Sequence, residues 1–154
     1  MIYQKLFDLI EDHQNELTNY LIEKIHETDE LTHYHTLPKD ELFERIHQVI
    51  YNVYARLAAW LDESKSKNVI FANYRELGRA RFQEGIPLHE SVLMLMIIKR
   101  HLFKYLRENR LYDSSYEVNQ LIEMSYYINL FFDRIIYSMV SGYEEEMLEN
   151  MNAE

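Results

Sequence analysis

The chain of 154 residues contains no cysteine, only three glycines and only two prolines. The absence of cysteine excludes disulfides, thiolate metal ligands and thiol nucleophiles, and it fits a reducing cytoplasm. Few glycines and prolines leave few tight turns for a sheet-rich fold, whereas good helix formers occur throughout the sequence. The sequence therefore predicts an all-α protein, and 47% hydrophobic residues are enough for the core of a single domain.

Positive charge and long apolar runs are also scarce. With 16 basic and 26 acidic residues the net charge is −10, which disfavours binding to nucleic-acid phosphates. The longest purely apolar run, Val92 to Ile98, is far shorter than the roughly 20 residues that a membrane-spanning helix needs. Asp8, Glu11 and Asp12 interrupt the N-terminal apolar pattern, so this segment is not a signal peptide. We therefore expect a cytoplasmic protein that binds neither nucleic acid nor membrane.

Apolar residues recur at steps of three and four, which predicts a bundle of about five helices. The expected helices span residues 2–26, 38–61, 69–84, 87–108 and 114–150. Residues 27–40 and the polar segment 62–68 are expected to connect them. Asp113 and Ser114 open the last helix, where Ser114 and Glu117 have the spacing of a capping box.

The last helix is expected to be about 35 residues, or roughly 50 Å, long and thus to exceed the height of the bundle. We divide the chain into a helical domain, 1–142, and a projecting helix end with an acidic tail, 143–154. An apolar stripe of Ile136, Val140, Tyr143, Met147 and Met151 continues into this end. Such a stripe usually pairs with a second copy or with a following domain, although Gly142 and the acidic tail are also compatible with fraying. We expect a homodimer through this helix or through helix 87–108.

The segment around the third and fourth helices has a corner and one unusual charge. Gly85 supplies a left-handed helix end, and Pro87 begins the next helix. The fourth helix is apolar on every side between Val92 and Ile98, so it lies either at the centre of the bundle or between two subunits. Arg81 falls on an apolar face and needs a partner, for which Glu90 is the candidate. A ligand-anchoring role for Arg81 is the alternative.

Histidines and carboxylates raise the question of a metal or haem. Two Glu-x-x-His pairs, Glu23 with His26 and Glu44 with His47, have di-iron spacing, but they face away from the apolar stripes.

His26, His33 and His35 could chelate a divalent ion on the first loop, and His101 or His89 could bind haem. Polar loops collect histidines in any case, and His101 lies beside the main stripe of its helix. We therefore expect no cofactor and no metal.

Catalytic patterns are missing. The sequence has neither a glycine-rich phosphate loop nor a nucleophile elbow, so we expect no enzyme activity. Five aromatic residues are expected to lie in the core rather than to line a ligand site, although a helical bundle can hide a small apolar cavity. They are Tyr74, Tyr126, Tyr127, Phe131 and Phe132.

The run LGRAR at residues 77–81, followed by EGIPLHE at 84–90 and an apolar helix that ends KRHLF at 99–103, resembles a known family. It is similar to the N-terminal domains of RsbR and RsbRD type co-antagonists. The resemblance is strongest over about thirty-five residues and fits the helix order of nearly the whole chain.

The resemblance implies a helical, globin-like, dimeric signal-input module that lacks haem and precedes an output domain. It implies scaffold roles, and no catalytic role, for the signature residues Leu77, Gly78, Arg81, Gly85, Pro87 and Glu90. No output domain follows Glu154 in this sequence. The chain is therefore expected to be either an input domain of a longer regulator or a stand-alone relative that acts through protein contacts.

Overall fold

The computed structural model describes residues 2–62, 67–109 and 114–153, and within these ranges the chain forms seven helices and no strand. The helices are α1 (Ile2–Asp12), α2 (Gln14–Glu27), α3 (Thr32–His35), α4 (Lys39–Leu61), α5 (Asn68–Gln83), α6 (Leu88–Glu108) and α7 (Ser115–Ala153). None of these helices is long and apolar enough to cross a bilayer. The expected all-α class with a long C-terminal helix is confirmed.

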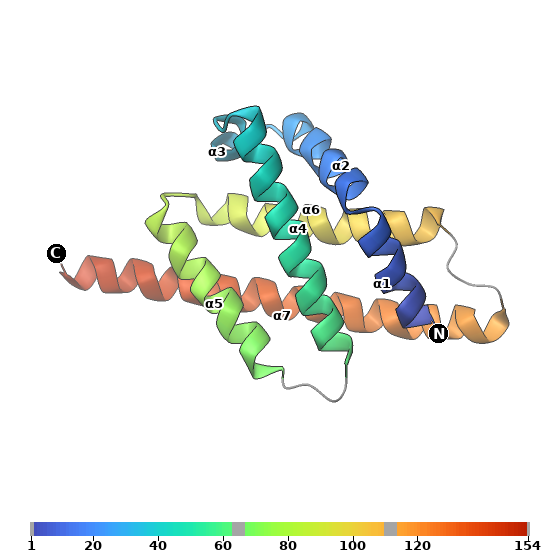
Figure 1. Ribbon diagram of the computed structural model, residues 1–154. Helices are drawn as coiled ribbons and strands as arrows, with labels where there is room; N and C mark the ends of the chain where they lie inside the picture. The colour runs from blue at the N-terminus through green and yellow to red at the C-terminus, as the bar shows by residue number, and fades with distance from the viewer. Residues whose placement is uncertain (1, 63–66, 110–113, 154) are drawn as a thin grey trace.

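The helices form two layers (Figure 1). α6 and α7 run side by side in opposite directions, while α4 and α5 cross in front of them and α2 packs against α4. The hydrophobic core fills the space between the layers and draws its largest fully buried side chains from both. Among them are Leu6, Leu17, Leu21, Ile46, Ile50, Leu57, Phe131 and Phe132.

The expected first helix, residues 2–26, is divided at His13. His13 has φ −124° and ψ 23°, outside the helical region, and its Nδ1 lies 2.8 Å from the carbonyl oxygen of Leu9. The division lets the two halves pack in different directions, since α1 contacts α7 whereas α2 contacts α4 and α6. One straight helix could not follow this change in the core.

The expected loop 27–40 holds the one-turn helix α3 as well as irregular chain. The capping interaction of the last helix is present, because the amide of Glu117 donates to Ser114 Oγ at 3.2 Å. Asp113 lies outside the described residues, as do residues 63–66 of the expected polar turn.

The helices α5 and α7 cross at close range, at Gly78 and Gly142. A methyl group on Gly78 would overlap the carbonyl oxygen of Met139 and lie 2.8 Å from the amide nitrogen of Tyr143. A methyl group on Gly142 would overlap the carbonyl oxygen of Arg75 and lie 2.7 Å from its carbonyl carbon. The two backbones therefore touch, which a Cβ on either residue would prevent.

One expectation about α7 is wrong. Tyr126 and Tyr127 are 61% and 39% exposed, because they lie on the side of α7 that faces away from the core. Tyr74, Phe131 and Phe132 are buried as expected. Contact between α7 and α5 continues beyond Gly142, since Arg79 of α5 binds Glu149 at 3.1 Å. Gly142 thus marks a packing contact and not fraying.

We predict that Gly142→Ala destabilises the fold by about 3 kcal/mol or more, because the added methyl group forces the backbones of α5 and α7 apart. Urea unfolding followed by circular dichroism measures this change. The matched control is Ser141→Ala, one residue away on the same helix, for which a change within about 0.5 kcal/mol is expected. Equal stability of the two variants would contradict the contact.

Candidate functional site

The signature segment 77–90 forms the corner between α5 and α6. Gly85 has φ 75°, the left-handed conformation predicted for it, and its amide donates to Phe82 O at 3.0 Å. The amide of Ile86 donates to Arg81 O at 3.1 Å, and Pro87 then precedes the first residue of α6. These bonds close the end of α5 and fix the direction in which α6 begins.

The sequence predicts an ion pair between Glu90 and Arg81. In the structure, Glu90 binds α3 instead. Its side chain is 0% exposed. Its carboxylate accepts hydrogen bonds from Thr32 Oγ1 at 3.1 Å and from the amide of His33 at 2.9 Å. The carboxylate therefore satisfies the N-terminal end of α3 while it occupies the favourable first turn of α6.

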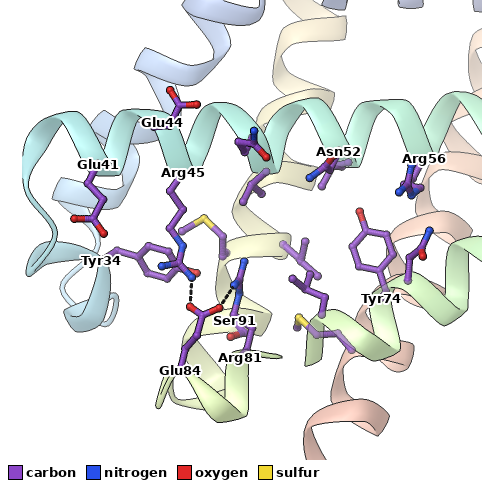
Figure 2. A pocket seen from close by; sticks show the side chains of 18 residues that line it. Tyr34, Glu41, Glu44, Arg45, Asn52, Arg56, Tyr74, Arg81, Glu84 and Ser91 are labelled. Carbon is purple, nitrogen blue, oxygen red and sulfur yellow. Dashed lines mark hydrogen bonds and ion pairs between the residues drawn. The ribbon is translucent and has the colours of Figure 1, made fainter. Parts of the chain in front are cut away.

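Arg81 instead binds Glu84, three residues further along the chain, at 2.8 Å. Glu84 also binds Arg45 of α4, so one carboxylate is shared by two guanidinium groups (Figure 2). Burial alone would raise the pKa of Glu84, but the hydrogen bond from Arg45 and the charge of Arg81 lower it below its usual value. This shared ion pair links the corner to α4.

Beside this ion pair, α4, α5 and α6 enclose a cleft of about 750 Å³ (Figure 2). Its floor is apolar and includes Leu77, Leu95 and Met139. The hydroxyls of Tyr74 and Ser91 line the cleft, although both residues are at least 95% buried and neither hydroxyl has a hydrogen-bond partner in the described part of the chain. Burial raises the pKa of Tyr74 above its usual value. We refer to this space as the α4–α5 cleft.

His101, the haem candidate, is buried on α6 with its ring stacked on Tyr20 at a centroid distance of 3.8 Å. Neither ring nitrogen has a hydrogen-bond partner among the described residues. Burial lowers the pKa of His101 to about 4, and the charges of Lys104 and Lys24 act in the same direction. His101 does not line the α4–α5 cleft, and Tyr20 covers one face of its ring.

Of the metal candidates His26, His33 and His35, the first and the last lie near each other, whereas the ring of His33 packs edge-on against Tyr34. The rings of His26 and His35 are 6.3 Å apart, and His35 Nε2 lies 2.6 Å from the carbonyl oxygen of Ile25. In the described ranges, no three His, Cys, Asp or Glu side chains are placed to hold a metal ion. Glu23 and Glu44, from the pairs with di-iron spacing, are exposed.

The stripe that the sequence suggests for dimerisation is partly buried against other residues of the same chain. Ile136, Val140 and Tyr143 are half-buried, and the Tyr143 hydroxyl donates to Ile86 O at 2.8 Å. Met147 is 36% exposed. The stripe therefore lies on the flank of α7 that meets the rest of the bundle.

Arg79, which lies inside the LGRAR run, forms a contact that was not predicted from the sequence. Its guanidinium binds three carboxylates of α7: Glu146 at 2.6 Å, Glu149 at 3.1 Å and Glu145 at 3.2 Å. Hydrogen bonds from Gln83 and Arg79 lower the pKa of Glu146. The acidic composition of residues 144–149 opposite an arginine-rich helix was a signal that could have revealed this contact.

The family comparison identifies a match over most of the chain. A family model described as "RsbT co-antagonist protein rsbRD N-terminal domain" matches residues 15–154. The match confirms the resemblance that was drawn from residues 77–103. Comparisons with curated proteins and with solved structures gave no significant match, so the globin-like arrangement stays a prediction.

The first prediction for this region concerns Glu90. Glu90→Ala should lower the free energy of unfolding by about 2 kcal/mol or more, because it leaves the His33 amide without its acceptor in a buried site. Glu90→Gln keeps an oxygen acceptor and should cost only about 1 kcal/mol. Urea unfolding of both variants measures the difference, and equal losses would argue against the capping role.

The second prediction concerns pH. Folding lowers the pKa of His101 from its ordinary value of 6.5 to about 4. Between pH 6.5 and about pH 4 the unfolded chain therefore binds more protons than the folded chain. The free energy of unfolding consequently falls as the pH falls through this range. His101→Phe keeps an aromatic ring on Tyr20 and should reduce this loss by about 1 to 3 kcal/mol. Urea unfolding of the wild type and the variant between about pH 7 and pH 4 measures this difference. The exposed control His89→Phe should keep the wild-type pH dependence.

Proposed function

The chain belongs to the family of RsbT co-antagonist protein rsbRD N-terminal domains, and on this premise we propose that it is a non-enzymatic bacterial signal-input domain that dimerises and relays a signal through α7. The family places the chain among the N-terminal domains of stress-signalling proteins, which work in complexes with partner proteins. The receiver is an output domain or a partner protein, and the site of action is the cytoplasm.

The observation that carries this proposal is a row of exposed apolar side chains along α7, although the exposed carboxylates Asp133 and Glu144 lie on the same line of the helix. It lies opposite the side that packs on α5 and α6, and it is separate from the Ile136 to Met147 flank. The stripe consists of Ile122 (65% exposed), Tyr126 (61%), Tyr137 (66%), Leu148 (54%) and Met151 (64%). Steps of 11 residues separate Tyr126, Tyr137 and Leu148, which keeps them on one line of a straight helix.

A second copy of the same helix is the natural partner for this stripe, because a two-fold axis brings identical apolar surfaces together. Pairing of two α7 helices would remove several large apolar side chains from water in each subunit. We refer to this surface as the α7 stripe.

The relay follows from the two faces of α7. One face carries Phe131, Phe132 and Gly142 into the core, and the opposite face carries the α7 stripe. A displacement of the helices that touch the inner face must therefore shift the stripe as well, since both belong to one continuous helix.

Two observations support the non-enzymatic part of the proposal. The chain has no cysteine. Ser91, the buried serine in the cleft, has no hydrogen bond to a histidine or carboxylate that would activate it.

We predict that the purified chain is a dimer at tens of micromolar, as measured by size-exclusion chromatography with light scattering. Tyr137→Glu places a charge in the α7 stripe and should raise the dimer dissociation constant by roughly tenfold or more. The control Tyr51→Glu changes a tyrosine of α4 that is 57% exposed and should leave the dimer intact. A monomeric wild-type chain would overturn this proposal.

A further inference from the structure

We propose that the α4–α5 cleft binds a small organic anion with a flat, apolar body. The anionic group would interact with Arg56 and the Tyr74 hydroxyl, and the apolar body would lie on the floor of the cleft. This inference deepens the proposed function, since it names the chemical class of a signal, but binding itself does not require dimerisation.

The polar end of the cleft is formed by Tyr74 of α5 and Arg56 of α4. Figure 2 shows the Tyr74 hydroxyl directed towards α4, where Asn52 and Arg56 project. The Tyr74 side chain is 5% exposed and its hydroxyl has no hydrogen-bond partner in the described ranges. A buried hydroxyl without a partner is unfavourable, so an acceptor supplied by a ligand gains a strong hydrogen bond there.

Arg56 supplies the charge that favours an anion. It is half-buried, and no ion pair or hydrogen bond joins it to another described residue. The other two arginines of the cleft, Arg45 and Arg81, share the carboxylate of Glu84. Arg56 is thus the one arginine lining the cleft whose charge no described carboxylate neutralises.

The carboxylates of the cleft do not oppose this assignment. Glu84 is held between two guanidinium groups, and that end of the cleft therefore carries a local excess of positive charge. Glu41 and Glu44 are exposed on the outer edge, and Figure 2 shows Glu44 pointing away from the cleft. An anion is favoured over a cation on both counts.

The floor of the cleft fits an apolar body, and aromatic rings in particular. Met94, Leu95 and Met139 are at most 3% exposed and line it together with half-buried Leu77. Methionine sulfur makes favourable contacts with aromatic rings, and its flexible side chain adapts to their shape. A cleft of about 750 Å³ is within the usual range for small-molecule sites.

The position of Met139 connects the cleft to α7. Its side chain lines the cleft, and its carbonyl oxygen lies against Gly78 at the crossing of α5 and α7. A bound molecule would therefore touch α4, α5, α6 and α7 at once. Occupancy of the cleft can in this way influence the helix that carries the α7 stripe.

The test uses three probes that share one aromatic body: naphthoate, the neutral naphthylmethanol and the cationic naphthylmethylamine, all substituted at the same ring position. Isothermal titration calorimetry on the full chain should rank naphthoate first, with an affinity roughly tenfold or more above that of the alcohol. The amine should bind more weakly than the alcohol. Absence of naphthoate binding at about 1 mM, or equal binding of acid and alcohol, would overturn the inference.

Two variants locate the anionic group. Arg56→Gln should remove the preference for naphthoate over naphthylmethanol, whereas Arg107→Gln, an exposed arginine of α6 outside the cleft, should preserve it. Tyr74→Phe should weaken naphthoate binding while its thermal midpoint stays at or above that of the wild type, because the removed hydroxyl has no partner. Unchanged affinity in both Arg56→Gln and Tyr74→Phe would refute the assigned polar end.

The inference and the proposed function can fail separately. The Tyr137→Glu variant is expected still to bind naphthoate, because Tyr137 lies outside the cleft. Binding to a chain that never dimerises would uphold the cleft and reject the relay through a dimer. A dimer that binds none of the probes would reject the cleft and leave the α7 stripe in place.

Discussion

The contact between the backbones of α5 and α7 at Gly78 and Gly142 is the constraint on which the other features depend. Because the two helices touch, Arg79 can reach three carboxylates of α7, and Tyr143 can reach the carbonyl of Ile86 at the corner. The same contact places Met139 at the base of the α4–α5 cleft. A larger residue at either glycine would alter the tail contacts, the corner and the cleft together.

Charged residues in this protein join segments that are distant in sequence. Glu90 ties α6 to α3 across 57 residues, and the shared Glu84 ties the corner to α4. Glu90 is fully buried, so its hydrogen bonds are shielded from water. Glu84 is partly exposed, so its ion pairs contribute less to the stability of the fold. The signature segment is therefore a junction at which α3 and α4 are joined to the corner between α5 and α6.

Local sequence signals predicted the helices, the Ser114 cap and the left-handed Gly85, because each depends on neighbouring residues. The break at His13 was missed because the apolar pattern continues through it, and only the packing of α1 and α2 on different partners requires it. The role of Gly142 and the partner of Glu90 depend on segments more than 50 residues away. The cleft could not be predicted either, since its residues come from five helices.

The glycine contact also limits how α7 can move. A shift of α7 along its axis by one turn would bring Ser138 or Glu146 under the carbonyl of Arg75, where there is no room for a Cβ. Sliding is therefore blocked, while a small tilt about the crossing point keeps Gly142 in place. The crossing acts as a fulcrum for a helix of 39 residues, so that its two ends swing in opposite directions. The longer part of α7 lies on the N-terminal side of Gly142. A slight tilt about the crossing point therefore displaces the region around Ile122 and Tyr126 more than it displaces the C-terminal end.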